Sequence, residues 1–277
     1  MKIFITGSTG FIGQNLVEYY KGHEVFEHKR YMDLLAKLDY FKPDVIINCA
    51  ADIYNPEEMF IPNVVWVHEC LGYVKEFPNT RMVQIGSSSE YGPMDRATKE
   101  TDRINPVDMY QATKGAATLL CQGYARQYNL DVKVARVYSA FGHHERPQRL
   151  FSRLYDAFYK DIPMTLFDGY HDFIYIKDFV RGINTLVNTT RNKGDIVNFG
   201  SGLQYSNLDV LKLWEKVTGR QAPVTYQDKM NKAFESKVWL CDTKYAADTY
   251  GFEVEYSLEE GIRDLIKTKN EYTPKNN

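Results

Sequence analysis

The sequence has few cysteines, no long apolar run and no excess of charge of either sign. Its four cysteines, Cys49, Cys70, Cys121 and Cys241, lie far apart and form no C-x-x-C pair, which argues against a disulfide framework and a zinc site. No apolar run approaches the roughly 18–20 residues needed to span a bilayer. A net charge of −2 gives no electrostatic basis for binding nucleic acid or an anionic membrane. The sequence therefore predicts no metal ion, no nucleic acid and no membrane partner.

The composition is ordinary for a soluble globular protein, with 44% hydrophobic and 25% charged residues. At 277 residues the chain can form one large α/β domain, or a large domain with a smaller one attached. An apolar strand begins at the N-terminus and leaves no room for a signal peptide, so we expect a cytoplasmic protein with reduced thiols. The 21 tyrosines are unusual. Most should be amphipathic core residues, so a tyrosine needs support from its position before a role is assigned to it.

The N-terminal stretch predicts a strand, a glycine-rich turn and an amphipathic helix in succession. The spacing is G-x-x-G-x-x-G: one glycine permits a positive φ, one lets the backbone approach a ligand, and one lets the helix pack closely. The unpaired N–H groups at the helix N-terminus favour a phosphate over the turn. This pattern is typical of dinucleotide-binding proteins. The expected cofactor contacts here are Gly7, Thr9, Gly10, Phe11, Ile12 and Gly13.

The second predicted strand, residues 24–28, bears on the choice of cofactor. Dinucleotide folds usually end this strand with an acid that binds the adenosine ribose hydroxyls. Here Lys29 and Arg30 stand at that place. Two cations could clamp a 2′-phosphate, which favours NADP(H) and leaves NAD(H) possible. The alternative is a solvated strand end whose lysine faces water.

Two further buried strands are predicted over residues 44–51 and 81–85. The small Ala50 and Ala51 would let a cofactor lie close to the first of them. The second opens into Ser87-Ser88-Ser89-Glu90-Tyr91-Gly92. Because ligands of open α/β sheets lie beyond the carboxyl ends of the strands, these serines are either hydroxyl donors for chemistry or simply turn formers.

A long helix is predicted from residue 109 to about 128, and it places Tyr110 and Lys114 on one face. A free tyrosine has a pKa near 10 and is a poor acid or base at neutral pH. A neighbouring ammonium should lower that pKa and make the phenol a usable proton donor and acceptor. With this many tyrosines and lysines, one Y-x-x-x-K match is expected by chance, so its placement carries the argument.

Taken in order, these motifs resemble the extended short-chain dehydrogenase/reductases, the NAD(P)-dependent epimerase/dehydratase enzymes of nucleotide sugars. The resemblance continues downstream and covers nearly the whole chain, over residues 134–142, 172–178, 198–202 and 256–262. It implies a Rossmann-like, doubly wound parallel sheet. Residues 1–140 would form the dinucleotide-binding domain, to which a strand at 196–199 returns. Residues 141–277 would form mainly a smaller substrate-binding part.

The resemblance also implies roles for individual residues. Tyr110 would be the catalytic acid/base, Lys114 would lower its pKa and bind the nicotinamide ribose, and Ser87 would hydrogen-bond the reacting oxygen. Hydride would pass to or from the nicotinamide. Further cofactor contacts would be Asp33, against the adenine, and Cys49, Ala50 and Ala51. The helix that bears Tyr110 implies a homodimer.

The implied reaction is redox or epimerisation at C4 of a nucleotide-linked sugar. The layout looks most like the 4-keto-sugar reductases, such as GDP-fucose synthase and dTDP-4-dehydrorhamnose reductase, but reductase and 4-epimerase both fit. Ser88 and Ser89 stand where the 4,6-dehydratases carry an Asp-Glu pair. Dehydration is therefore an alternative, but one without the acid and the base that usually carry it out. A non-catalytic dinucleotide-sensing protein of this fold is a further alternative. Candidate substrate contacts are Ser88, Ser89, Glu90, His143 and Arg149.

Overall fold

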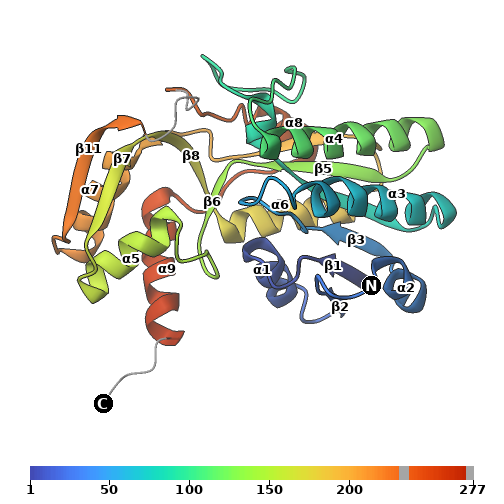
Figure 1. Ribbon diagram of the computed structural model, residues 1–277, viewed down its shortest axis with the longest axis horizontal. Coiled ribbons are helices and arrows are strands. Elements are labelled where there is room, and N and C mark those ends of the chain that lie inside the picture. The colour runs from blue at the N-terminus through green and yellow to red at the C-terminus, as the bar shows by residue number, and fades with distance from the viewer. Residues whose placement is uncertain (231–236, 273–277) are drawn as a thin grey trace.

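The central feature of the computed structural model is a six-stranded parallel sheet with strand order β2-β1-β3-β4-β5-β9 (Figure 1). The structure describes residues 1–230 and 237–272. The chain runs outward from β1 to β2 on one side and from β3 onward on the other, which confirms the predicted doubly wound sheet. The strands are β1 (Lys2–Thr6), β2 (Glu24–His28), β3 (Val45–Asn48), β4 (Arg81–Ser87), β5 (Val132–Val137) and β9 (Ile196–Phe199).

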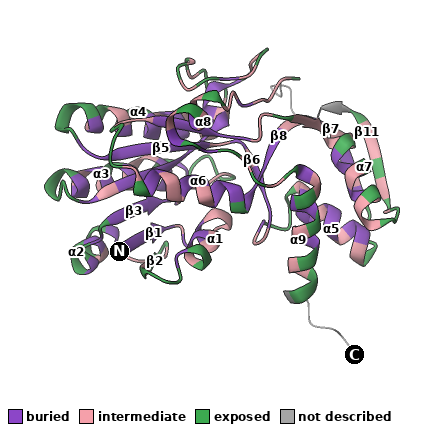
Figure 2. Cartoon of the chain, turned by 180° about the vertical axis from the view of Figure 1, so that it is seen from behind, coloured by how far each residue is buried: buried purple, intermediate pink, exposed green. Residues whose placement is uncertain are grey.

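Helices cover both faces of this sheet. Helices α1 (Phe11–Tyr19) and α6 (Ile176–Asn188) pack together on one face, and α2 (Leu34–Phe41), α3 (Trp66–Glu76) and α4 (Met109–Tyr128) pack on the other. Because alternate strand residues point to opposite faces, each central strand supplies both cores and is buried along its length (Figure 2). The sheet face toward α1 and α6 carries the side chains of Ile3, Ile5, Val45, Ile47, Val83 and Ile85. The face toward α2, α3 and α4 carries those of Phe4, Ile46, Met82, Val132 and Val134.

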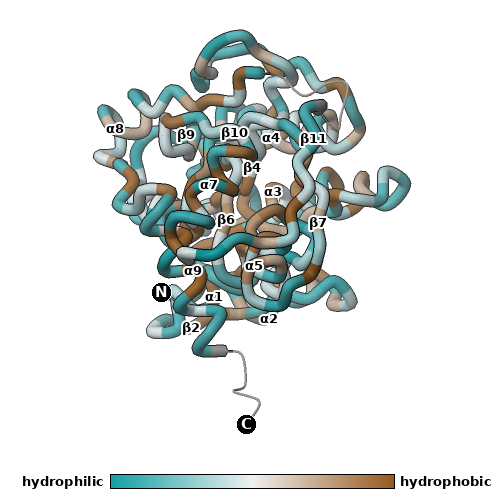
Figure 3. The backbone as a smooth tube through the Cα atoms, turned by 90° about the vertical axis from the view of Figure 1, so that its left-hand side faces the viewer, coloured by the Kyte–Doolittle hydropathy of each residue, from teal (hydrophilic) through white to brown (hydrophobic). Residues whose placement is uncertain are grey.

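A smaller part lies beside one end of the main sheet (Figure 1) and faces the viewer in Figure 3. It holds a three-stranded sheet of β6 (Ser139–Phe141), β8 (Tyr170–Tyr175) and β10 (Gln204–Ser206), and a parallel pair of β7 (Met164–Asp168) and β11 (Val224–Met230). Its helices are α5 (Leu150–Lys160), α7 (Asn207–Thr218) and α9 (Leu258–Tyr272). Their apolar faces meet around Trp214, which is fully buried and stacks on Phe158.

The strand expected at 196–199 does return to the main sheet, where β9 pairs with β5. The expected division near residue 140 differs from the packing at one point. Helix α6 lies within the predicted substrate part, yet it packs on α1, β4 and β5. A parallel connection into β9 needs such a crossover helix on the sheet face. Helix α8 (Lys244–Tyr250) also contacts β9, and residues 231–236 and 273–277 of the predicted part lie outside the described residues.

Element ends differ from the predicted ones for local reasons. The third strand ends at Asn48, earlier than predicted. Helix α2 begins at Leu34 because the Asp33 carboxylate accepts a hydrogen bond from the Ala36 N–H and caps it. Helix α3 is preceded by a π-helical turn, η1 (Ile61–Val65). Across the two described stretches, no helix is long and apolar enough to cross a membrane.

Candidate active site

A cavity of 380 Å³ lies beyond the carboxyl ends of the central strands. Gly7, Cys49, Ser87 and Val137 line it, each at or just after the end of β1, β3, β4 or β5. The strand order reverses between β1 and β3, and such a switch point is where open α/β sheets bind ligands. The smaller part closes the other side of the cavity with Tyr170, His171 and Trp239.

The glycine turn forms one wall of the cavity. Gly7 has a φ of +60°, and a Cβ there would lie 2.8 Å from the Ala50 nitrogen, so a larger residue would fit neither the backbone angle nor the space. Gly10 precedes α1 without any side-chain cap, so within the described part of the chain the first N–H groups of α1 have no side-chain partner at the cavity wall. This cradle fits a diphosphate. Of the predicted contacts Gly7, Gly10, Phe11, Ile12, Gly13, Cys49 and Ala51 line the cavity, whereas Thr9 and Ala50 do not.

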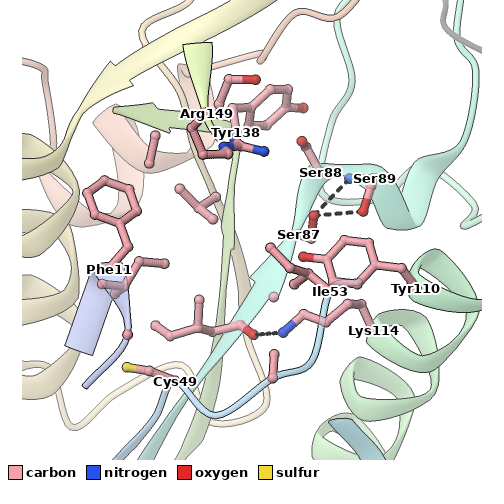
Figure 4. Close-up of a pocket in the computed structure, with 18 of the residues that line it drawn as sticks. Phe11, Cys49, Ile53, Ser87, Ser88, Ser89, Tyr110, Lys114, Tyr138 and Arg149 are labelled. Atoms are coloured by element: carbon pink, nitrogen blue, oxygen red, sulfur yellow. Dashed lines mark hydrogen bonds between the residues drawn. The ribbon is translucent and has the colours of Figure 1, made fainter. Parts of the chain in front are cut away.

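The predicted catalytic residues come together at one end of the cavity (Figure 4). Asp108 caps α4 by accepting a hydrogen bond from the Gln111 N–H, and this start of the helix presents Tyr110 and, one turn later, Lys114. The Ser87 hydroxyl lies 2.7 Å from the Ser89 hydroxyl. The Tyr110 hydroxyl points toward the Ser87 side chain (Figure 4). Two hydroxyl groups from different elements therefore converge on one point.

The pKa of Tyr110 is shifted in the direction opposite to the predicted one. Burial raises the pKa of Tyr110, and this outweighs the lowering by its hydrogen bond with Ser87 and by the charge of Arg149. Burial also lowers the pKa of Lys114. The Lys114 ammonium donates to the carbonyl oxygen of Ile85 rather than to the phenol (Figure 4). The spacing of the two residues was predicted, but the balance between burial and charge was not.

Ser88, Ser89 and Arg149 also line the cavity, as predicted for substrate contacts. Ser88 accepts a hydrogen bond of 3.1 Å from the indole nitrogen of Trp239, 151 positions along the chain. Sequence patterns do not reveal such a long-range contact. Other lining residues that the sequence analysis missed are Tyr54, Tyr138, Glu145 and Arg146. Two arginines within four residues, Arg146 and Arg149, were the sequence signal that could have pointed to this loop, and with it to Glu145 and Arg146.

Glu90 does not line the cavity. Its carboxylate is fully buried in the core, where it pairs with Arg136 at 2.9 Å and accepts hydrogen bonds from the Thr118 hydroxyl and the Ser87 N–H. The short turn η2 (Ser88–Tyr91) is capped in this way. The structure therefore places Glu90 as a structural partner of Arg136, not as a substrate contact.

His143 also lies outside the cavity lining, next to α1. Its ring packs against His144, whose Nε2 lies 2.6 Å from Glu18 of α1. The His143 carbonyl accepts a hydrogen bond from Asn15 of the same helix. Burial lowers the pKa of His143. These contacts fix the loop onto α1, and the predicted substrate contact of His143 is not seen.

Lys29, Arg30 and Asp33 lie past the end of β2 and do not line the cavity. Arg30 forms a 2.6 Å ion pair with Glu58 and lies 3.7 Å from Asp52. Asp33 is occupied as the cap of α2. Glu58 and Asp52 thus offset the positive charge of Arg30. The sequence analysis had assigned that charge to a 2′-phosphate.

Comparison with known proteins adds the following. The family model described as "NAD dependent epimerase/dehydratase family" matches residues 3–200. "Uncharacterized UDP-glucose epimerase YtcB" of Bacillus subtilis is 27% identical, over 96% of this chain and 97% of that protein. "UDP-glucuronate 4-epimerase" of Thermodesulfobacterium geofontis is 28% identical, over 80% of this chain and 69% of that protein.

Solved structures show the same fold. MoeE5 in complex with UDP-glucuronic acid and NAD has a TM-score of 0.87 at 23% identity, covering 99% of this chain and 100% of that one. The UDP-glucuronic acid 4-epimerase from Bacillus cereus, in complex with UDP-glucuronic acid and NAD, has a TM-score of 0.86 at 23% identity with the same coverage. Both hold NAD, so the NADP(H) preference predicted from Lys29 and Arg30 finds no support in them.

Proposed function

The chain belongs to the NAD dependent epimerase/dehydratase family, and from this we propose that it is an NAD(H)-dependent 4-epimerase of a uridine-diphosphate-linked hexose or hexuronic acid. The substrate class follows the names of the two relatives above. The observation that carries the proposal is the convergence of the Tyr110 and Ser87 hydroxyl groups in the cavity that the glycine turn also lines. The cradle at α1 would hold the dinucleotide diphosphate, with Lys114 near its nicotinamide end.

When bound, the nicotinamide supplies hydride transfer to and from C4 of the sugar. Tyr110 takes the proton of the C4 hydroxyl as the carbonyl forms, and returns it when the hydroxyl is restored on the other face. Ser87 donates a hydrogen bond to the same oxygen. Because one acid/base serves both directions, epimerisation needs no further titrating group.

The serines favour epimerisation over dehydration. Loss of water across C5 and C6 needs a base at C5 and an acid at the C6 oxygen, and an unactivated serine hydroxyl is poor in both roles. Ser88 and Ser89 occupy the two positions next to Ser87, and Ser88 already accepts from Trp239. Glu90, the nearest carboxylate in the sequence, is turned into the core toward Arg136. The hydroxyls of Ser88 and Ser89 suit hydrogen bonding to sugar oxygens.

A direct test combines cofactor identification with a sugar assay. We expect the purified protein to release NAD on denaturation, detected by mass spectrometry. Incubation with UDP-glucose or UDP-glucuronic acid should give a mixture of C4 epimers in the NMR spectrum, with no net production of NADH. Net consumption of NADPH on a 4-keto sugar, without epimer formation, would instead identify a reductase and overturn the proposal.

The ion pairs of Arg30 predict the cofactor preference. Wild-type protein should bind NADH at least about tenfold more tightly than NADPH, because a 2′-phosphate must compete with Glu58 and Asp52 for this guanidinium. Glu58→Gln removes the closer acid and should strengthen NADPH binding several-fold while leaving NADH binding unchanged. Fluorescence titration of both cofactors measures this. Tighter binding of NADPH than NADH by the wild type would contradict the prediction.

We also propose that the chain forms a homodimer through the outer faces of α3 and α4. Four large apolar side chains are each more than half exposed here, Met109 and Leu119 on α4 and Phe60 and Ile61 at the start of the η1 turn that leads into α3, and exposed apolar side chains favour association. Leu119→Glu should convert a dimer into a monomer in light scattering after gel filtration. Ile162→Glu, at an equally exposed position in the smaller part, is the matched control and should remain dimeric. A wild-type monomer would contradict the proposal.

A further inference from the structure

Glu145 is a carboxylate in the wall of the cavity that the reaction described above does not use. It lies in the loop between β6 and α5, and its side chain is only 3% exposed. Burial of a carboxylate is unfavourable unless it is paired. It is also unexpected here, because the proposed substrate carries a doubly charged diphosphate into the same cavity. What holds Glu145 in place therefore matters.

Two groups hold the Glu145 carboxyl. One oxygen accepts a 3.1 Å hydrogen bond from the N–H of Ser152, in the first turn of α5. The residue before α5, Arg149, provides no side-chain cap, so Glu145 caps the helix in its place. The other oxygen lies 3.9 Å from the Arg149 side chain. The cap fixes the carboxyl, whereas the Arg149 side chain has, among the described residues, this one long contact as its ion pair.

Arg149 is the more adaptable partner. About half of its side chain is exposed, and it lies in the cavity near Tyr138 (Figure 4). Its charge reaches the reacting end, where it lowers the pKa of Tyr110. Arg146, in the same loop, is instead placed over the ring of Tyr54, 5.3 Å from its centroid. Arg149 is thus the cation of this loop that can turn toward a ligand while the loop stays in place.

On the basis of the proposed function, we propose that Glu145 is the counter-ion of Arg149 before substrate binds, and that Arg149 leaves it for an anionic group of the nucleotide sugar while Glu145 takes up a proton from solvent. The anionic group is the diphosphate or a sugar carboxylate. Glu145 thereby positions Arg149, and it couples substrate binding to pH.

The charges around Glu145 give the direction of this coupling. The cations that face it are Arg149 on its own loop and Lys269 of α9, which donates to the Ser152 hydroxyl. Burial outweighs both and raises the pKa of Glu145 to about 7. A substrate anion that takes Arg149 away raises this pKa further. Binding therefore takes up a proton, and affinity falls as pH rises through 7.

Calorimetric titration with UDP-glucose tests this, because its diphosphate lacks the phosphate proton that titrates near pH 6. The wild type should bind up to about tenfold more weakly at pH 8 than at pH 6, the limit for one group of pKa near 7, with proton uptake that approaches one at pH 8 and is small at pH 6. Glu145→Gln keeps an oxygen for the Ser152 N–H and should bind equally well at both pH values. Arg149→Met should bind weakly at both. Glu100→Gln changes a half-buried carboxyl outside the cavity, whose pKa is also raised by burial, and should keep the wild-type pH dependence.

The outcomes separate this inference from the proposed function. A pH dependence with UDP-glucose assigns Arg149 to the diphosphate, and one seen only with UDP-glucuronic acid assigns it to the carboxylate. If the wild type binds UDP-sugars without proton uptake, or if Glu145→Gln keeps the pH dependence, the inference is overturned and the proposed function stands. If neither UDP-sugar binds at any pH, both are overturned.

Discussion

Replacement of Tyr110 by phenylalanine should lower kcat by about 10³-fold, within the range that a positioned acid/base contributes. The phenol is the group that moves the C4 proton in both directions, and a serine hydroxyl cannot replace it. The change removes one oxygen and leaves the half-buried ring in its place at the start of α4. NAD binding and the melting temperature should therefore stay close to wild type. Epimerisation of UDP-sugars followed by NMR, together with a cofactor titration, measures both effects.

Tyr138→Phe is the matched control for this experiment. Tyr138 is a second buried tyrosine of the same cavity, but its hydroxyl is hydrogen-bonded to Thr98. Loss of that bond should cost about 1 kcal/mol of stability and change kcat by less than tenfold. Full activity of Tyr110→Phe would remove the phenol from the mechanism. A wild-type protein that binds NAD and turns over no sugar nucleotide would favour the dinucleotide-sensing alternative.

The features predicted best from the sequence are those that depend on local pattern. Continuous apolar runs gave the buried parallel strands, and the spacing of Gly7, Gly10 and Gly13 gave the turn and the start of α1. Tyr110 and Lys114 are one helical turn apart, so their shared face followed from helix geometry. The meeting of these elements at one cavity followed from the rule that parallel strands present their carboxyl ends together.

The features that were missed depend on contacts between distant parts of the chain. The sequence alone predicted a free cation at Arg30, but in the folded chain the segment after β3 brings Glu58 and Asp52 next to it. Trp239 reaches Ser88 only because the chain returns to the cavity after β11. The pKa of Tyr110 depends on how deeply the phenol is buried, and no spacing rule reports depth. Charge balance and burial are properties of the folded molecule, so residue type alone did not predict them.

Arg136→Met should lower the free energy of unfolding by about 3–5 kcal/mol, because it leaves the carboxylate of Glu90 buried without its partner. Both side chains are almost completely inaccessible, at 2% for Arg136 and 0% for Glu90, so water cannot replace the lost charge. The Arg136 guanidinium also covers the ring of Tyr91, at 4.5 Å from its centroid, and methionine restores only part of that packing. Urea denaturation followed by circular dichroism gives the loss.

The double variant Arg136→Met/Glu90→Gln separates the structural role of Glu90 from a role in substrate binding. With the negative charge removed, the amide oxygen can still accept from the Ser87 N–H, and the amide NH2 at the place of the other oxygen can donate to the Thr118 hydroxyl, so most of the lost stability should return. KM for the sugar nucleotide should stay within about threefold of wild type, because Glu90 has no place in the cavity wall. A tenfold rise in KM at restored stability would return Glu90 to the substrate site and contradict this assignment. The result also bears on the reaction itself, since the carboxylate nearest to the serines in the sequence is then committed to the core and cannot serve as the base of a dehydration.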